Sequence, residues 1–480
     1  MSRLHGRLNE SDKALEFGFK ALSNSERMGN RRGSASAQAA IARAYQGKGL
    51  LSEARSSFKR ALDFAREVKD PQAQALDLLG LAEVAASAGN LAESLQHNEE
   101  ALTIATKMED WRAMAASNIG LARAYGALYR TKDALTHNEI AYRQALRIED
   151  KFRESQALLG MARCFGFMKE TDRSRTHYAE ALRLAQEMKE PNLIVQCLNG
   201  LGRTSLAAGK SSDALGEFRK AYDLAVKIGN RHAQGASLLG LGRASLDNRK
   251  AEVSVDYLKQ ARAIFQQTND TQQEATCLSS LGEAYYALRQ FEDAERCQLR
   301  NLEIIKPLGN SRKIGSTLSR LGQIYTRLCE LAPTITEAAI LASKAMDNFS
   351  ESIDLARQDQ DYGGEVRTLV RVANLYWRHF RNTQKAQLAI EQAIRAARQI
   401  NPPTTELMWI LRQAGELYAD SGRADIAEER FREALEIAEG LGSTPDENQL
   451  LRRLLAIYTR NGDCVKMAEV KKRLFGNKNA

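Results

Sequence analysis

The sequence predicts an all-α protein, a right-handed superhelical solenoid of antiparallel helix pairs. Of its 480 residues only 7 are proline, whereas the helix formers Ala, Leu, Arg, Glu and Gln are abundant along the whole chain. Helix-start residues recur with a period of about 40 residues, and a pattern of small and large side chains repeats with the same period. Such a period is typical of stacked repeats, in which each unit buries its apolar face against its neighbours.

Helix-start signals lie at the same place in each repeat. Asp and Asn are good N-cap residues because their side-chain oxygens accept hydrogen bonds from backbone N–H groups that have no partner within the helix. They occur at Asn30, Asp70, Asp110, Asp150, Asn230, Asp270 and Asn310, with Glu190 in the remaining gap. Pro71 and Pro191 follow a cap at the first helical position, where a missing N–H costs nothing. We therefore predict that one helix ends and another begins at each of these positions.

Small and large residues alternate at fixed places within each repeat. The first helix carries a small residue at Ala42, Ala82, Ala122, Ala162, Gly202, Gly242, Gly282 and Gly322. In most repeats an aromatic residue follows three positions later, at Tyr45, Tyr125, Phe165, Tyr285 and Tyr325. The second helix has small residues at Ala14, Ala54, Ala134, Ala214 and Ala294, and aromatic residues at Phe58, Tyr178 and Phe218. Small residues let helices approach closely, and large neighbours fill the grooves between them.

This spacing resembles the tetratricopeptide repeat (TPR), and the likeness is clearest from Leu281 through Ala294. The unit of that family has about 34 residues, so a repeat of about 40 residues lengthens each helix by nearly one turn. The longer unit is similar to the subclass found in rapsyn and in the Pins/LGN cell-polarity adaptors. The chain departs from the Pins/LGN pattern Asn-Leu-Gly-Asn, because it reads Gly-Leu-Gly-Arg at residues 200–203 and 240–243.

The register of the repeats divides the chain into four parts. Residues 1–30 form an N-terminal half-repeat, in which a second helix is expected to begin near Ser11. Residues 31–328 hold the regular repeats, 329–341 are an insertion within a repeat, and 342–480 hold further repeats with a basic capping helix. We count about eleven complete helical hairpins. For the half-repeat, three explanations stay open: truncation, an alternative start, or an end that a partner caps.

Composition and motifs argue against several classes of protein. No apolar run approaches the ~18 residues of a membrane span, and the N-terminus lacks the apolar core of a signal peptide. The six cysteines are scattered and form no CxxC pair, which is typical of buried thiols in a reducing compartment, so we expect a cytoplasmic protein. No GxSxG, HExxH or paired-carboxylate motif is present. We therefore expect no enzyme activity and no cofactor.

Other recurring residues have structural interpretations. His97, His137 and His177 also recur with the repeat, but ligands of one zinc ion must converge within about 2.1 Å of it, and stacked repeats hold them a helix diameter apart. We expect packed or surface histidines and no metal site. Two sets of residues are expected in the core: Cys197 with Cys277, and Tyr376 with Trp377 and Trp409. For the second set the alternative is a second contact surface. The basic segment that ends the chain is expected to cap the last helix.

The candidate binding residues form a column on the first helices. An arginine directly follows the small residue at Arg43, Arg123, Arg163, Arg203 and Arg243, which we call the arginine row. The family resemblance implies that this face lines a concave groove, where consecutive arginines would stand roughly 10 Å apart. Guanidinium groups bind carboxylates with two hydrogen bonds, so the row suits an extended acidic peptide. The alternative is that each arginine pairs with a nearby Glu or Asp of the solenoid.

We therefore expect a non-catalytic TPR scaffold or adaptor that binds an extended or helical segment of a partner protein, with acidic character, in its concave groove. The resemblance places such a scaffold in cytoskeletal, polarity or signalling complexes. One alternative is a helical-repeat protein that binds single-stranded RNA. The net charge of +9 allows this, but the mixed charges and the lack of interleaved aromatic residues argue against it. The other alternative is a regulatory domain that senses a short peptide.

Overall fold

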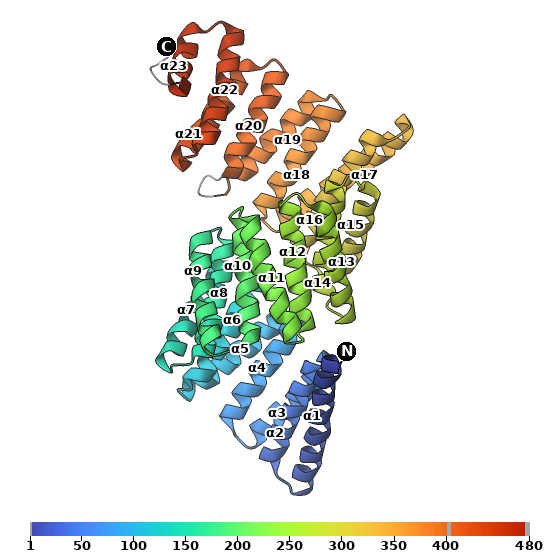
Figure 1. Ribbon diagram of the computed structural model, residues 1–480, viewed down its shortest axis with the longest axis vertical. Coiled ribbons are helices and arrows are strands. Elements are labelled where there is room, and N and C mark those ends of the chain that lie inside the picture. The colour runs from blue at the N-terminus through green and yellow to red at the C-terminus, as the bar shows by residue number, and fades with distance from the viewer. Residues whose placement is uncertain (1, 401–404, 476–480) are drawn as a thin grey trace. The chain divides into compact units, whose positions relative to one another are not determined.

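The computed structural model describes residues 2–400 and 405–475, and the side chains from residue 12 onward within those ranges. In this part of the chain the predicted all-α solenoid of antiparallel helix pairs is confirmed, with helices α1 to α23 and no strand. Successive helices run antiparallel beside each other (Figure 1). The chain forms two compact units, unit 1 (Met1–Cys277) and unit 2 (Leu278–Ala480), and the boundary falls within α14.

Unit 1 is regular. After α1, every helix from α2 to α13 has 17 residues, and each even-numbered helix pairs with the odd-numbered helix that follows it. The helices are α1 (Ser2–Arg27), α2 (Arg31–Gly47), α3 (Leu51–Glu67), α4 (Pro71–Ser87), α5 (Leu91–Lys107), α6 (Trp111–Ala127), α7 (Thr131–Arg147), α8 (Lys151–Phe167), α9 (Thr171–Glu187), α10 (Pro191–Ala207), α11 (Ser211–Lys227), α12 (Arg231–Asp247), α13 (Ala251–Gln267) and the first part of α14 (Thr271–Ala287).

Unit 2 departs from this regular length. Its helices are α15 (Phe291–Ile305), α16 (Ser311–Leu331), α17 (Ile335–Gln358), α18 (Tyr362–Asn374), α19 (Thr383–Ala397), α20 (Thr405–Asp420), α21 (Ala424–Leu441), α22 (Thr444–Asn461) and α23 (Cys464–Phe475), with a short 3-10 turn at Lys306–Leu308. The helices α16 and α17 are lengthened to 21 and 24 residues. The helix α18 ends in a π-helical turn, η2 (Leu375–His379). In the described residues the helices α2 to α23 form eleven pairs, as predicted, and α1 precedes them.

The predicted helix starts are confirmed by the cap geometry. A side-chain oxygen accepts a hydrogen bond from a backbone N–H of the first turn at Asn30, Asp70, Asp110, Asp150, Asn230, Asp270 and Asn310. Glu190 makes no such bond, and its helix begins with Pro191 instead. Gly29, Gly229 and Gly309 have φ near +65°, the left-handed conformation that ends the preceding helix at little cost.

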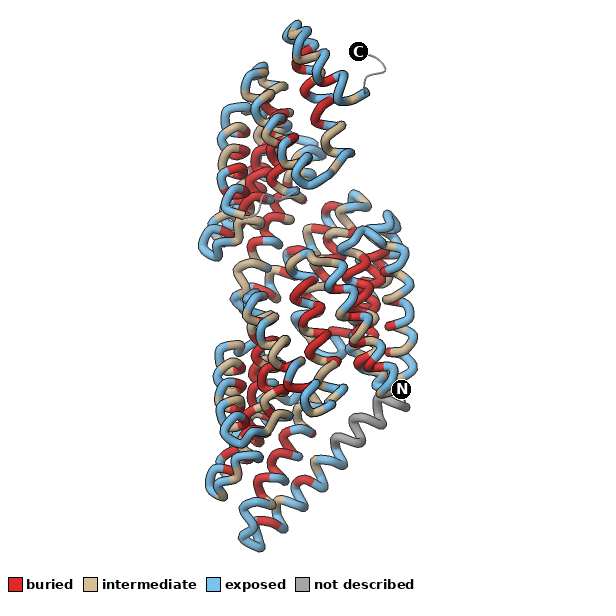
Figure 2. The backbone as a smooth tube through the Cα atoms, turned by 90° about the vertical axis from the view of Figure 1, so that its left-hand side faces the viewer, coloured by how far each residue is buried: buried red, intermediate tan, exposed pale blue. Residues whose placement is uncertain are grey.

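The pairs of unit 1 pack against each other where an aromatic ring meets a glycine backbone. A Cβ atom on Gly200 would overlap the ring of Tyr178, and one on Gly240 would overlap Phe218. Both rings are at most 3% exposed, on second helices that precede the glycine-bearing first helices. Buried residues follow the helix sides that face neighbouring helices (Figure 2). These glycines therefore serve close helix packing, as the sequence predicts.

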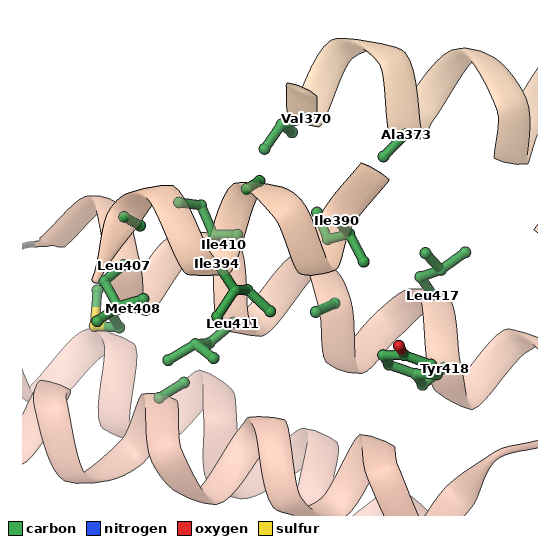
Figure 3. Packing of buried hydrophobic residues seen from close by; sticks show 14 of the residues in the cluster. Val370, Ala373, Ile390, Ile394, Leu407, Met408, Ile410, Leu411, Leu417 and Tyr418 are labelled. Atoms are coloured by element: carbon green, nitrogen blue, oxygen red, sulfur yellow. The ribbon is translucent and has the colours of Figure 1, made fainter. Parts of the chain in front are cut away.

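Unit 2 joins its pairs through tyrosine hydroxyls. Tyr325, Tyr418 and Tyr458 each donate a hydrogen bond to a glutamate of the preceding second helix, at 2.8–3.1 Å. Burial and the neighbouring Glu391 carboxylate raise the pKa of Tyr418 to about 12. The apolar core of this unit gathers side chains of α18, α19 and α20, such as Ile394 and Ile410 (Figure 3). Hydrogen bonds between neighbouring pairs thus supplement the apolar contacts.

Three details differ from the sequence predictions or lie outside the described structure. The helix α1 is continuous from Ser2, so no new helix begins near Ser11. Trp409 is 41% exposed and does not belong to the core, whereas Cys197 and Cys277 are fully buried as predicted. Of the basic segment that ends the chain, the residues after Phe475 lie outside the described structure. None of the described helices is long and apolar enough to cross a membrane.

Candidate functional site

The arginine row lies on five first helices of unit 1: Arg43 on α2, Arg123 on α6, Arg163 on α8, Arg203 on α10 and Arg243 on α12. In each case the residues immediately before and after the arginine, such as Ala122 and Ala124, are buried, and the arginine is exposed. Successive residues of an α-helix are rotated by about 100°, so one residue within such a stretch points away from the core while its neighbours point into it. The repeat therefore places all five side chains on the same face of their helices.

None of the five arginines makes an ion pair with an acidic side chain of the described residues. Other arginines of unit 1 do pair in this way. For example, Arg55 Nη2 lies 2.5 Å from Glu93 Oε1, and Arg112 Nε lies 3.5 Å from Asp150 Oδ2. The alternative prediction, that each arginine of the row pairs with a nearby acid of the solenoid, is met only by longer-range attraction, between Arg43 and Asp77 and between Arg123 and Glu83.

The middle of the row is the most enclosed part. Burial lowers the pKa of Arg163, and the neighbouring guanidinium groups of Arg123 and Arg203 lower it further. Burial also lowers the pKa of Arg123, which the Glu83 carboxylate partly offsets. Both side chains are in contact with solvent, and protein lies on several sides of each. A charged group on a concave surface has such surroundings. An anion placed there would relieve the repulsion between these arginines.

Arg123 and Arg163 line one pocket of about 290 Å³, which we call the arginine pocket. Its other lining residues come from α6, α7 and α8: Ile119, Ala122, Gly126, Ala127, Thr131, Ala134, Asn138, Gln156, Gly160, Cys164 and Phe167. The pocket thus combines two guanidinium groups with amide and apolar side chains. A few polar groups in a mainly apolar concavity are typical of a ligand site.

Asn138 shapes the arginine pocket, and the sequence analysis did not single it out as a site residue. It occupies the column that holds Phe58, Tyr178 and Phe218 in other repeats, and it is 3% exposed. Its amide Nδ2 donates to the carbonyl of Ala134 at 2.8 Å, which fixes the side chain against α7. The signal in the sequence is an asparagine at a position where Phe58, Tyr178 and Phe218 place a large ring between neighbouring helix pairs. Asn138 thus presents an amide to the pocket where other repeats have a ring.

The ends of the row have different surroundings. Arg43 lies near the buried carboxyl of Asp77 and stabilises its charged form. Arg203 donates from Nη2 to the Tyr178 hydroxyl oxygen at 3.4 Å. Between Arg43 and Arg123 the column holds Glu83, which interrupts the run of positive charges. The structure therefore brings together Arg123, Arg163 and Arg203, and it does not join Arg43 to them.

The histidine column packs within individual repeats. His137 Nδ1 is 2.8 Å from Asn118 Oδ1, and its ring stacks on Tyr125 with centroids 5.4 Å apart. His177 Nδ1 is 2.8 Å from a carbonyl oxygen of its own helix, and its ring contacts Phe165. Among the described residues no group of three or more His, Cys, Asp or Glu is arranged to hold a metal ion. These rings fill space beside the aromatic column.

Residues 275–306 match the tetratricopeptide repeat model of known families. This segment includes the stretch from Leu281 in which the sequence pattern is clearest. No curated protein is similar enough in sequence to count as a match.

Several solved structures are similar to this chain at low sequence identity. A Rap protein complexed with Competence and Sporulation Factor has a TM-score of 0.53 and 14% identity, covering 82% of this chain and 98% of that chain. Aspartyl phosphate phosphatase F from Bacillus subtilis has a TM-score of 0.48 and 15% identity, covering 77% and 95%. The quorum sensor NprR from B. thuringiensis, in its apo form, has a TM-score of 0.47 and 15% identity, and the match covers 73% of this chain and 97% of that chain. The chain therefore contains one segment, residues 275–306, that matches the tetratricopeptide repeat, and this segment lies within a solenoid of stacked helix pairs.

Proposed function

We propose that the protein is a non-catalytic TPR scaffold that binds an acidic segment of a partner protein along the middle of the arginine row. The observation that carries this proposal is the set of three neighbouring guanidinium groups, Arg123, Arg163 and Arg203, none of which makes an ion pair with an acidic side chain of the described residues. Guanidinium groups bind carboxylates strongly where water is partly excluded. The arginine pocket between α6 and α8 accepts an anchoring side chain, and the arginines set the orientation of the segment.

The proposal also concerns the kind of complex in which the scaffold acts. The long repeat unit favours a scaffold of the kind seen in rapsyn and Pins/LGN-type adaptors, which would assemble cytoskeletal, polarity or signalling complexes in the cytoplasm. A regulatory domain that senses a short peptide uses the same groove chemistry. The Rap structure complexed with Competence and Sporulation Factor has the same fold as this chain, which supports that second candidate. Both candidates require that a protein segment occupies the arginine row.

The experiment compares two triple variants in affinity purification with mass spectrometry. In the test variant Arg123, Arg163 and Arg203 are changed to Glu. In the control variant Arg60, Arg143 and Arg219, exposed arginines on second helices of unit 1, are changed to Glu. Both variants change the net charge equally, and circular dichroism checks that their helicity is unchanged.

We expect the test variant to lose at least tenfold in recovery of the partners that the wild type enriches, and the control variant to keep them. If both variants recover the same partners, the arginine row does not bind them and the proposal is wrong. A salt titration with labelled single-stranded RNA tests the remaining alternative. Binding of RNA near physiological salt that the test variant abolishes would replace the protein segment by RNA as the ligand.

A further inference from the structure

Unit 2 contains a larger pocket, of about 620 Å³, which we call the tryptophan pocket. It is lined by residues of the π-helical turn η2 and the residue Arg381 after it, of α20, of α21 and of α22: Trp377, Arg378, Arg381, Glu416, Ala419, Asp420, Phe431, Arg453, Ala456, Ile457 and Arg460. Its volume lies within the range of about 300–1,000 Å³ that ligand sites occupy. None of its residues belongs to the arginine row.

The tryptophan pocket has an excess of positive charge. Four arginines and two acids line it, and one of the acids is already paired, because Arg453 Nη2 lies 3.0 Å from Glu416 Oε1. Arg378, Arg381 and Arg460 make no ion pair with an acid of the described residues. With two negative and four positive groups, the pocket carries a formal charge of about +2 and is suited to an anionic ligand.

The charges are ordered across the pocket. Arg378 and Arg381 belong to the end of the α18 segment, Glu416 and Asp420 to α20, and Arg460 to α22. In the stack of helix pairs α20 comes between α18 and α22 (Figure 1). Because an α-helix with its side chains is about 10–12 Å across, we estimate that the two basic edges are about 20 Å apart, with the acids of α20 between them. A single compact anion cannot reach both edges. A segment with carboxylates near its ends and an uncharged middle matches this order.

The middle of the pocket offers apolar surface for such a segment. Trp377 is half-buried, and the guanidinium of Arg378 lies over its ring, 5.5 Å from the ring centroid. The buried side chain of Ile457 and the side chain of Ala419 also line the pocket. The π-helical turn places Trp377 and Arg378 here, and such turns are frequent at functional sites. An aliphatic or aromatic side chain on this surface would bury apolar area beside the carboxylate contacts.

We propose that the tryptophan pocket is a second binding site of the protein, for a short extended protein segment with acidic side chains at both ends and a large apolar residue between them. At about 3.3 Å per residue, about six residues span the two basic edges. The end carboxylates bind Arg378 and Arg381 on one edge and Arg460 on the other. The apolar residue packs on Trp377, and the unpaired carboxylate of Asp420 disfavours a further negative charge in the middle.

Intrinsic fluorescence tests this proposal, because Trp377 is one of only three tryptophans. Trp111→Phe and Trp409→Phe leave Trp377 as the sole reporter. The probe is the acetylated and amidated peptide Glu-Glu-Leu-Phe-Glu-Glu, and its matched control carries Lys in place of each Glu. We expect a saturable change in emission with the acidic peptide that weakens as salt is raised, and none with the basic peptide.

Arginine variants in this background assign the binding to the pocket. Arg378→Glu with Arg460→Glu should weaken the acidic peptide at least tenfold. The matched control is Arg395→Glu with Arg452→Glu, two exposed arginines of α19 and α22 that do not line the pocket, and it should leave the affinity within twofold. The Gln versions of the two test substitutions give the same comparison with a smaller change of charge, if the Glu versions lose helicity.

The peptide experiment and the arginine-row experiment can succeed or fail independently of each other. Substitution of Arg123, Arg163 and Arg203 lies in unit 1 and should not change the Trp377 signal. The proposal is overturned if the acidic peptide gives no saturable signal up to millimolar concentration, if the basic peptide gives the same signal, or if the Arg378 and Arg460 variants bind as the wild type does. Loss of partners in the arginine-row experiment has no bearing on this result.

Discussion

Unit 1 and unit 2 make their contacts between pairs with different chemistry. In unit 1 a buried ring such as Tyr178 lies directly on the backbone of a glycine in the next first helix, so a side chain at that glycine has no space. In unit 2 a tyrosine hydroxyl reaches a glutamate of the preceding helix, and the sequence separation is 27 residues for Tyr418 and 30 for Tyr325. Contact with a backbone demands a fixed period, whereas a hydrogen bond at the end of a long side chain tolerates a changed one. The helices have one regular length in unit 1 and variable lengths in unit 2, and this difference in contacts is consistent with both.

Asp77 is a buried acid among the regular helix pairs of unit 1, and its replacement should have the largest effect on stability. It is 2% exposed in a column that otherwise holds small residues such as Ala37, Ser117 and Ala157. Burial and the nearby Asp70 carboxylate raise the pKa of Asp77 to about 7, although Arg43 opposes the shift. Between pH 4 and pH 7 the folded protein keeps a proton that the unfolded chain releases, so stability falls as the pH rises.

We expect Asp77→Ser to remove most of this pH dependence and to raise the free energy of unfolding at pH 7.5 by on the order of 2–4 kcal/mol. Urea unfolding at pH 5, 6, 7 and 8 measures both effects. Equal slopes of stability against pH in wild type and variant would contradict the prediction. Asp63→Ser, at an exposed position of α3, is the control and should change neither quantity.

The glycine contacts of unit 1 should be intolerant of even one methyl group. Gly200→Ala places a Cβ atom within the ring of Tyr178, and we expect a loss of about 1–3 kcal/mol despite the better helix propensity of alanine. Gly216→Ala is the matched control, because nothing lies within 4 Å of a Cβ atom there. The control should gain about 0.5–1 kcal/mol. Urea unfolding compares the two, and similar effects of both substitutions would mean that the close contact does not determine the packing.

Much of the fold follows from residues that act locally. An Asp or Asn before a helix binds backbone N–H groups within its own first turn, so caps such as Asp110 are visible in the sequence. The face on which Arg163 lies follows from helical periodicity alone. Its enclosure between Arg123 and Arg203 depends on how neighbouring pairs pack, and no local pattern records that. The sequence left a second contact surface open at Trp377, but the tryptophan pocket itself depends on how α20, α21 and α22 pack beside the π-helical turn, and no local pattern records that.

Removal of a tyrosine hydroxyl should lower the free energy of unfolding more in unit 2 than in unit 1, by less than the glycine substitution does. Tyr418→Phe removes the hydrogen bond to Glu391 and leaves that carboxylate with one partner fewer, so we expect a loss of about 1 kcal/mol. Tyr125→Phe in unit 1 is the matched control, since the Tyr125 ring stacks on His137 and the described structure assigns its hydroxyl no hydrogen bond. This control should change stability by less than about 0.5 kcal/mol. Thermal unfolding of both variants measures the difference, and equal losses would remove the distinction between the units.

The arginine row should itself cost a little stability. Arg163 stands between Arg123 and Arg203 with no acid to balance it, and like charges at such separations are unfavourable by a few tenths of a kcal/mol. Arg163→Gln should therefore stabilise unit 1 by about 0.2–0.5 kcal/mol at low salt, and the gain should shrink as salt screens the repulsion. Arg143→Gln, on an exposed face of α7, should show no such gain. Melting temperatures at 20 mM and 500 mM salt measure the effect. A loss of stability in Arg163→Gln would mean that the arginine supports the fold, whereas a gain that costs the protein its acidic ligand is what a binding residue produces.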